Sequence, residues 1–126
     1  MAKYEHPDIM DGGLLKLKTD CDKIAVVSAY TLGDAYATVA AAILAEAAMV
    51  DADLVISTSG NNRLLTTAVK TDAAANASGG GAGNHAVLLD TVNSKVLYAT
   101  PATAQAIVAG NPVEIGAMVI TRTQPV

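Results

Sequence analysis

The sequence has no Phe and no Trp, only four Tyr and a single cysteine among its 126 residues. Without large aromatic side chains, the core has to be filled by Ala, Val, Leu and Ile, which pack as small units. One cysteine excludes an internal disulfide, and Cys21 stands between two aspartates, which raise rather than lower a thiol pKa. We therefore interpret Cys21 as a structural or incidental residue and not as a nucleophile.

Charge is also scarce, at 16% of residues against roughly 25% in an ordinary soluble domain. Nine of the charged residues lie within the first 23 positions, so the remaining surface is largely uncharged. Such a surface predicts association with copies of the chain or with a partner. The net charge of −4 and the lack of a basic cluster argue against a nucleic-acid partner.

Long apolar runs are missing as well. The longest one, Val39 to Ala45, is far short of the roughly 18 residues that a membrane span needs. The first ten residues, MAKYEHPDIM, contain no apolar core of a secretion signal. We expect no membrane partner.

Motifs that would carry chemistry are absent or out of context. There is no phosphate-binding G-x-x-x-x-G-K-[ST] and no G-x-S-x-G nucleophile turn. The segment 81–86 fits a dinucleotide-binding glycine pattern, but a loop precedes it and a predicted strand follows. The two histidines, His6 and His85, are far apart in the sequence. We therefore predict that the protein is not an enzyme and has no catalytic residue, no cofactor and no metal ligand.

What the sequence does contain is a series of short apolar segments separated by Gly, Asn, Pro and Ser clusters. Segments at this spacing predict the strands of a sandwich or barrel. In the last segment, alternation places Val113, Ile115, Ala117 and Val119 on one face. The predicted strands cover residues 23–30, 53–57, 63–69, 85–90, 95–100, 104–109 and 112–122.

Residues 35–50 are ambiguous, because their alanines favour a helix while no polar face recurs at helical spacing. A helix here would be buried on nearly all sides. We favour two short strands with a break near Glu46 over that alternative.

The length predicts one domain. Residues 1–22 are polar and predict an N-terminal arm with at most one short helix, around Leu14 to Thr19. Residues 23–126 form the predicted β domain, in which the Gly- and Ala-rich segment 71–84 is a flexible surface loop.

The C-terminal half carries a more specific pattern, NHAVLLDTVNSKVLYAT followed by IVAGNPVEIGAMVIT and a terminal Thr-Gln-Pro. This order resembles a family of small structural proteins of tailed bacteriophages, in which KIAVVSAY and LVISTSGNNRLLTTAV also have counterparts. Relatives tend to have a Trp-containing strand where this chain has Gly116-Ala117-Met118. The resemblance also implies an extended conformation for 35–50.

The resemblance implies an all-β fold, a jelly-roll-like β-sandwich, and the role of a head decoration or cement protein. Such a protein binds the outside of the major capsid protein shell and bridges capsomers on the virion surface, after synthesis in the host cytoplasm. A tail- or fibre-associated binding module is the alternative. The unpaired edges of a small sandwich further predict a homo-oligomer, a dimer or a trimer. The candidate interface residues lie in the arm, in 35–50 and in the 71–84 loop: Tyr4, Ile9, Leu14, Leu15, Tyr36, Asn76 and Asn84.

Overall fold

A computed structural model describes residues 3–125 and is mostly β, with antiparallel sheets of four, three and two strands and two α-helices. The four-stranded sheet has the order β2-β1-β6-β7. Its strands are β1 (Lys23–Val27), β2 (Ile43–Ala48), β6 (His85–Asp90) and β7 (Lys95–Pro101). The prediction of a β-rich chain is thus confirmed.

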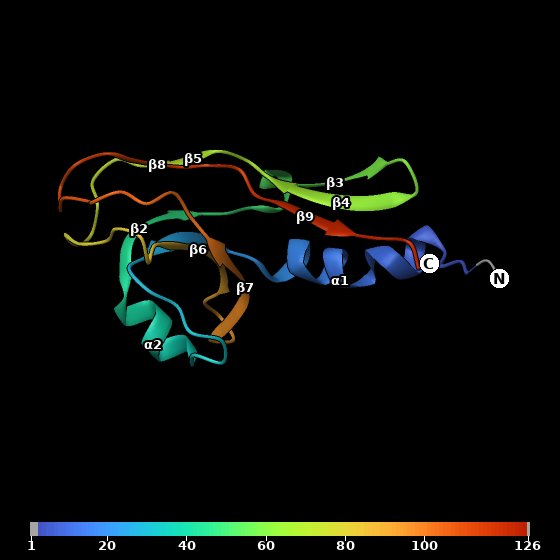
Figure 1. Cartoon of the computed structure of the whole chain (residues 1–126), viewed down its shortest axis with the longest axis horizontal. Coiled ribbons are helices and arrows are strands. Elements are labelled where there is room, and N and C mark those ends of the chain that lie inside the picture. The colour runs from blue at the N-terminus through green and yellow to red at the C-terminus, as the bar shows by residue number, and fades with distance from the viewer. Residues whose placement is uncertain (1–2, 126) are drawn as a thin grey trace.

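The two smaller sheets lie end to end in a second layer (Figure 1). Beneath this layer, the four-stranded sheet occupies one half of the molecule and helix α1 (Pro7–Asp20) the other half. The three-stranded sheet, of order β3-β4-β9, contains β3 (Leu54–Ser59), β4 (Asn62–Thr67) and β9 (Val119–Arg122); β5 (Lys70–Asp72) pairs with β8 (Val113–Ile115), and the 3-10 turn η1 (Asp51–Asp53) precedes β3.

The core has two parts, on opposite faces of the four-stranded sheet. The larger part lies between the layers and includes Leu14, Leu65 and Ile115. The smaller part is covered by the short helix α2 (Tyr36–Ala41), which contributes Val39. Because β1 and β6 are buried on both faces, their sequences are continuous apolar runs without polar alternation.

Helix α1 is longer than the predicted short helix, so the N-terminal segment is a docked element and the prediction of an arm is wrong over most of 1–22. Pro7 suits a first helical position, and the His6 ring nitrogen accepts a hydrogen bond from the Asp8 N–H as an N-cap. The helix tolerates Gly12 and Gly13 because it packs Met10 and Leu14 against the sheet.

Residues 35–50 divide into helix α2 and strand β2, so the prediction of two strands is half wrong. The break lies at Ala42 rather than Glu46. The alanine-rich first half follows its helix propensity and buries Val39. The second half pairs with β1 along its whole length, and tertiary pairing overrides propensity there.

The predicted strand 112–122 is interrupted by Gly116-Ala117-Met118 and forms β8 and β9. The interruption reverses the alternation: Val113 and Ile115 are buried as predicted, but Met118 is buried while Val119 is exposed. The predicted strand 104–109 does not form, and only Ile107 makes a bridge, to Gly79. The remaining predicted strands are present, β6 with its predicted ends and the others with shifted ends.

A candidate interaction surface

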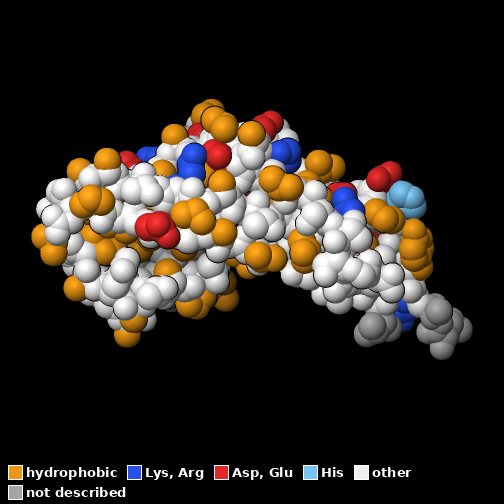
Figure 2. Space-filling model, turned by 90° about the horizontal axis from the view of Figure 1, so that it is seen from above, with side chains coloured by type: hydrophobic (Ala, Val, Ile, Leu, Met, Phe, Trp, Pro, Cys, Tyr) orange, Lys and Arg blue, Asp and Glu red, His pale blue; other side chains and the backbone are white. Residues whose placement is uncertain are grey.

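The outer face of the three-stranded sheet is uncharged. Strand register places Val55, Thr66 and Val119 side by side across β3, β4 and β9 on the face turned away from α1. The next row is Ser57, Leu64 and Thr121. Val55 and Val119 are more than half exposed. Figure 2 looks onto this layer from above, and its charged groups are few and scattered.

The opposite face of this sheet is fastened to α1. Leu54, Leu65 and Thr67 are buried there, and Ile56 and Ile120 pack against the core. One side of the sheet therefore supplies the stability, and the other side is free to contact a partner.

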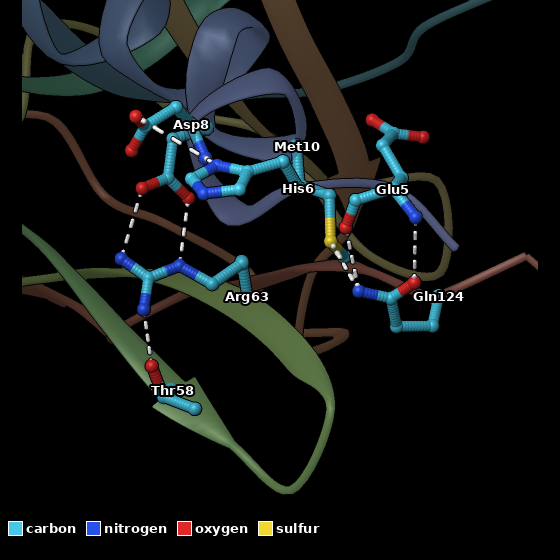
Figure 3. A network of polar contacts seen from close by, with 8 residues as sticks. Glu5, His6, Asp8, Met10, Thr58, Arg63 and Gln124 are labelled. Atoms are coloured by element: carbon cyan, nitrogen blue, oxygen red, sulfur yellow. Dashed lines mark hydrogen bonds and ion pairs between the residues drawn. The ribbon is translucent and has the colours of Figure 1, made fainter.

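A bidentate ion pair joins α1 to the sheet (Figure 3). The Arg63 Nε and Nη2 atoms donate to the two carboxylate oxygens of Asp11 at 2.8 and 2.9 Å, and Nη1 donates to the Thr58 hydroxyl. These hydrogen bonds hold the pKa of Asp11 below its ordinary value of 3.8 and raise that of Arg63. The Asp11 carboxylate also offsets the positive charge of Arg63, which stands opposite Arg122 in the strand register and would otherwise face a like charge.

The two ends of the described chain are joined at the same place (Figure 3). The Glu5 N–H donates to the Gln124 side-chain oxygen at 3.1 Å, and the Gln124 amide donates to the Glu5 carbonyl at 2.8 Å. The sheet behind the uncharged face is thus held by the helix, by an ion pair and by the C-terminal segment.

Most charged side chains after Lys23 are engaged within the chain, which adds to the low charge of the surface. They form ion pairs, such as Lys70 with Asp53 at 3.0 Å, or accept hydrogen bonds from loop backbone, as Asp90 does in the β6–β7 turn. The residues engaged in these ways are Asp34, Glu46, Asp53, Arg63, Lys70, Asp72 and Asp90.

The candidate interface residues do not form one patch. Leu14 and Asn84 are buried, at 2% and 1% exposure, so they are corrected here from interface to internal residues. Tyr36 is half-buried against the smaller part of the core. The exposed candidates are Tyr4, Ile9, Leu15 and Asn76.

Asn84 has a clear internal function. Its side-chain oxygen accepts a hydrogen bond from the Gly81 N–H, and its amide donates to the carbonyls of Thr103 and Gln105. The 71–84 segment, predicted as a surface loop, is therefore joined to 103–105 and also to Leu44, whose carbonyl accepts hydrogen bonds from the Asn76 and Ala77 N–H groups. Sequence reasoning missed this role because two of the three partners, Thr103 and Gln105, are distant along the chain.

The side chains and segments that could take part in chemistry lie apart from one another. Burial raises the pKa of the Cys21 thiol to about 11, in keeping with a structural residue. Among residues 3–125, no three His, Cys, Asp or Glu side chains gather as a metal site would need. The 81–86 glycine segment leads into β6 and not into a helix.

None of the helices in the described part of the chain is long and apolar enough to cross a membrane.

A groove of about 330 Å³ lies between β7 and the β8–β9 segment. Its lining combines apolar side chains such as Met118 with the polar groups of Tyr98, Gln105 and the carboxylate of Glu114.

Comparison with protein-family models, with curated proteins and with solved structures finds no match to this chain. The surface chemistry described above is therefore the basis for a functional proposal.

Proposed function

We propose that the protein is a non-enzymatic virion structural protein of a tailed bacteriophage, a decoration or cement protein. In this role it binds the outside of the major capsid protein shell and bridges neighbouring capsomers. The observation that carries the proposal is the uncharged outer face of the β3-β4-β9 sheet, whose other face packs against α1. The β6–β7 sequence pattern, which resembles phage structural proteins, supports it, and a jelly-roll-like arrangement remains part of the proposal.

An uncharged face suits this role because its removal from water on binding costs little free energy. Burial of the valine side chains is favourable in free energy, and the Ser and Thr hydroxyls can re-form hydrogen bonds with a partner. A charged face would require an ion partner for every buried group. A single contact of modest area is weak, but many copies on one shell add up.

The first test is the location and copy number of the chain in particles of the phage that encodes it. Quantitative mass spectrometry and imaging of purified particles should find hundreds of copies on the head. A few copies at the tail would favour the alternative, a tail- or fibre-associated binding module. Absence from the particle would overturn both roles.

The second test asks whether the uncharged face makes the contact. Val119→Lys puts a charge on this face, on its edge strand β9, whereas Val92→Lys changes an equally apolar and more exposed residue in the β6–β7 turn. We expect the first variant to lose binding to shells stripped of the protein and the second to bind as the wild type does. Equal binding by both variants would contradict the assignment of the face.

A further inference from the structure

Four strands form the edges of the two larger sheets, and three of these edges are protected. The edge of β2 is covered by the 72–77 segment, whose Asn76 N–H donates to the Leu44 carbonyl. Strand β7 begins with Lys95 and ends with Pro101, and β9 is short and ends at Arg122. Lysine, proline and short length are the usual means of blocking an edge.

Strand β3 has none of these protections. Its six residues, LVISTS, contain no charge and no proline. Its register with β4 runs without a bulge from Leu54 to Ser59. Such a strand is a ready template for pairing with another strand.

The backbone pattern shows which groups of β3 face the open edge. The Ala68 N–H donates to the Asp53 carbonyl, whereas the Thr67 N–H donates to Met118 on the β9 side. Because hydrogen-bonded and non-hydrogen-bonded pairs alternate in antiparallel sheets, the backbone groups of Leu54, Ile56 and Thr58 point away from β4. The Leu54 carbonyl already accepts a hydrogen bond from the Lys18 ammonium at 2.6 Å.

Ile56 and Thr58 are different from Leu54 in this respect. Within residues 3–125, no hydrogen bond joins the backbone N–H or C=O of either residue to another element. The exposure of Thr58 agrees with an open edge.

We propose that this edge pairs with β3 of a second copy, antiparallel about a two-fold axis at Ser57. Ile56 and Thr58 of one copy then exchange hydrogen bonds with Thr58 and Ile56 of the other, and the two Ser57 side chains stand opposite each other. The two three-stranded sheets become one six-stranded sheet with a continuous uncharged outer face. This pairing concerns the isolated chain and does not depend on binding to a shell.

This register is favoured by the groups that flank β3. A register centred on Ile56 would set the Leu54 carbonyl, which already accepts a hydrogen bond from Lys18, opposite Thr58 within β3, whereas the register centred on Ser57 sets it opposite a residue of the turn beyond the strand. In the register centred on Ser57, Leu54 lies opposite Gly60, so the acidic turn at Asp51 and Asp53 approaches the neutral Gly60–Asn62 turn. No like charges then oppose one another across the interface.

A second copy fits this edge better than an unrelated strand because the strand is complementary to itself under the two-fold operation. The contact is small, at the low end of specific interfaces, so the pair is expected to be weak and concentration-dependent. A covalent trap is therefore a sharper test than molecular size.

The experiment uses single cysteine variants of the full chain, oxidised under mild conditions. Residues opposite each other in a non-hydrogen-bonded pair have Cβ atoms about 4.5–5.5 Å apart, close to the distance that a disulfide needs. Ser57→Cys should therefore form a disulfide-linked dimer, roughly tenfold faster than random collision allows. The native Cys21 is buried and does not compete.

Val55→Cys and Ser59→Cys, on the same face of the same strand, are the matched controls. Neither should cross-link to itself, but a mixture of the two should cross-link because Val55 of one copy lies opposite Ser59 of the other. The proposal would be overturned if Ser57→Cys did not cross-link or if all three single variants cross-linked at equal rates. Faster self-linking of Val55→Cys or Ser59→Cys would overturn it as well. Circular dichroism of each variant confirms that it is folded.

Discussion

At the scale of single residues, the clearest constraint is the contact between Gly80 and its surroundings. Gly80 has a φ of +92°, which side chains other than glycine rarely adopt. A Cβ atom there would lie 2.6 Å from the Asn84 side-chain oxygen and 3.0 Å from the Gln105 carbonyl. Gly80 therefore permits the hydrogen bonds through which Asn84 joins two loops.

We expect Gly80→Ala to lower the free energy of unfolding by about 3 kcal/mol, as backbone strain and steric overlap add together. Gly110→Ala is the matched control, because Gly110 has a similar φ of +87° and no atom near its Cβ position. It should cost about 1 kcal/mol. Urea denaturation of both variants measures the difference, and equal losses would show that the contact with Asn84 is unimportant.

Residue roles of this kind are only partly predictable from the sequence. The raised pKa of the Cys21 thiol could be inferred from its aspartate neighbours, although its main cause is burial and Asp22 adds a smaller contribution. The role of Asn84 could not be inferred, since its partners, Thr103 and Gln105, become neighbours only after the chain has folded. An Asn in a glycine-rich segment is typical of an exposed turn, and that pattern led to the wrong environment.

At the scale of secondary-structure elements, strands buried on both faces were the most predictable. Strands β1 and β6 have compact apolar sequences bounded by polar residues, and both were predicted. The alternation in 112–122 failed at Gly116, where the chain leaves one sheet and enters another. Alternation of apolar and polar residues does not show where a strand is interrupted.

Helix α1 was underestimated because its stability comes largely from docking. Its two adjacent glycines weaken an isolated helix, and its apolar face is narrow. The helix is stabilised instead by the buried side chain of Met10 and by the ion pair between Asp11 and Arg63. The partner of Asp11 lies more than fifty residues away and is invisible to local patterns.

The docking of α1 should be sensitive to acid. The pKa of Asp11 is lowered chiefly by its hydrogen bonds to Arg63, and hydrogen bonds also lower the pKa values of Asp53 and Asp90. A carboxyl with a lowered folded-state pKa stabilises the fold above its unfolded pKa, and the contribution is lost as pH falls through the folded value. We expect the free energy of unfolding to decrease from about pH 5 to about pH 2.

Asp11→Asn should be less stable than the wild type at neutral pH and should lose less on acidification. The control is Asp51→Asn, which alters a carboxylate that makes no hydrogen bond or ion pair among residues 3–125 and should keep the wild-type slope. Urea midpoints at a series of pH values give the comparison. A wild-type slope in Asp11→Asn would contradict the role of the ion pair.

At the scale of the whole molecule, the chain is elongated. Its accessible surface of 6844 Å² exceeds the roughly 6,200 Å² expected for a compact protein of this mass. Figure 1 shows why: the four-stranded sheet and α1 occupy different halves beneath one long layer. The shape could not be predicted from composition, because it depends on where the chain changes sheets.

Because of this shape, pairing through β3 should change the length of the particle in solution. Strand β3 lies in the half that contains α1 and runs along the long axis, while α2 and the four-stranded sheet lie in the other half (Figure 1). A two-fold axis perpendicular to the sheet at Ser57 therefore sends the two four-stranded sheets to opposite ends of the dimer. The dimer should be much longer than the monomer, and not a compact pair.

Small-angle X-ray scattering of the Ser57→Cys chain, reduced and oxidised, measures this length. The reduced chain, at low concentration, should have a radius of gyration above the roughly 14 Å of a compact protein of 126 residues. The oxidised dimer should show a largest internal distance well beyond that of the monomer, because its two lobes point in opposite directions. A largest distance close to that of the monomer would mean that the lobes lie side by side, and an antiparallel pairing of β3 could not produce that arrangement.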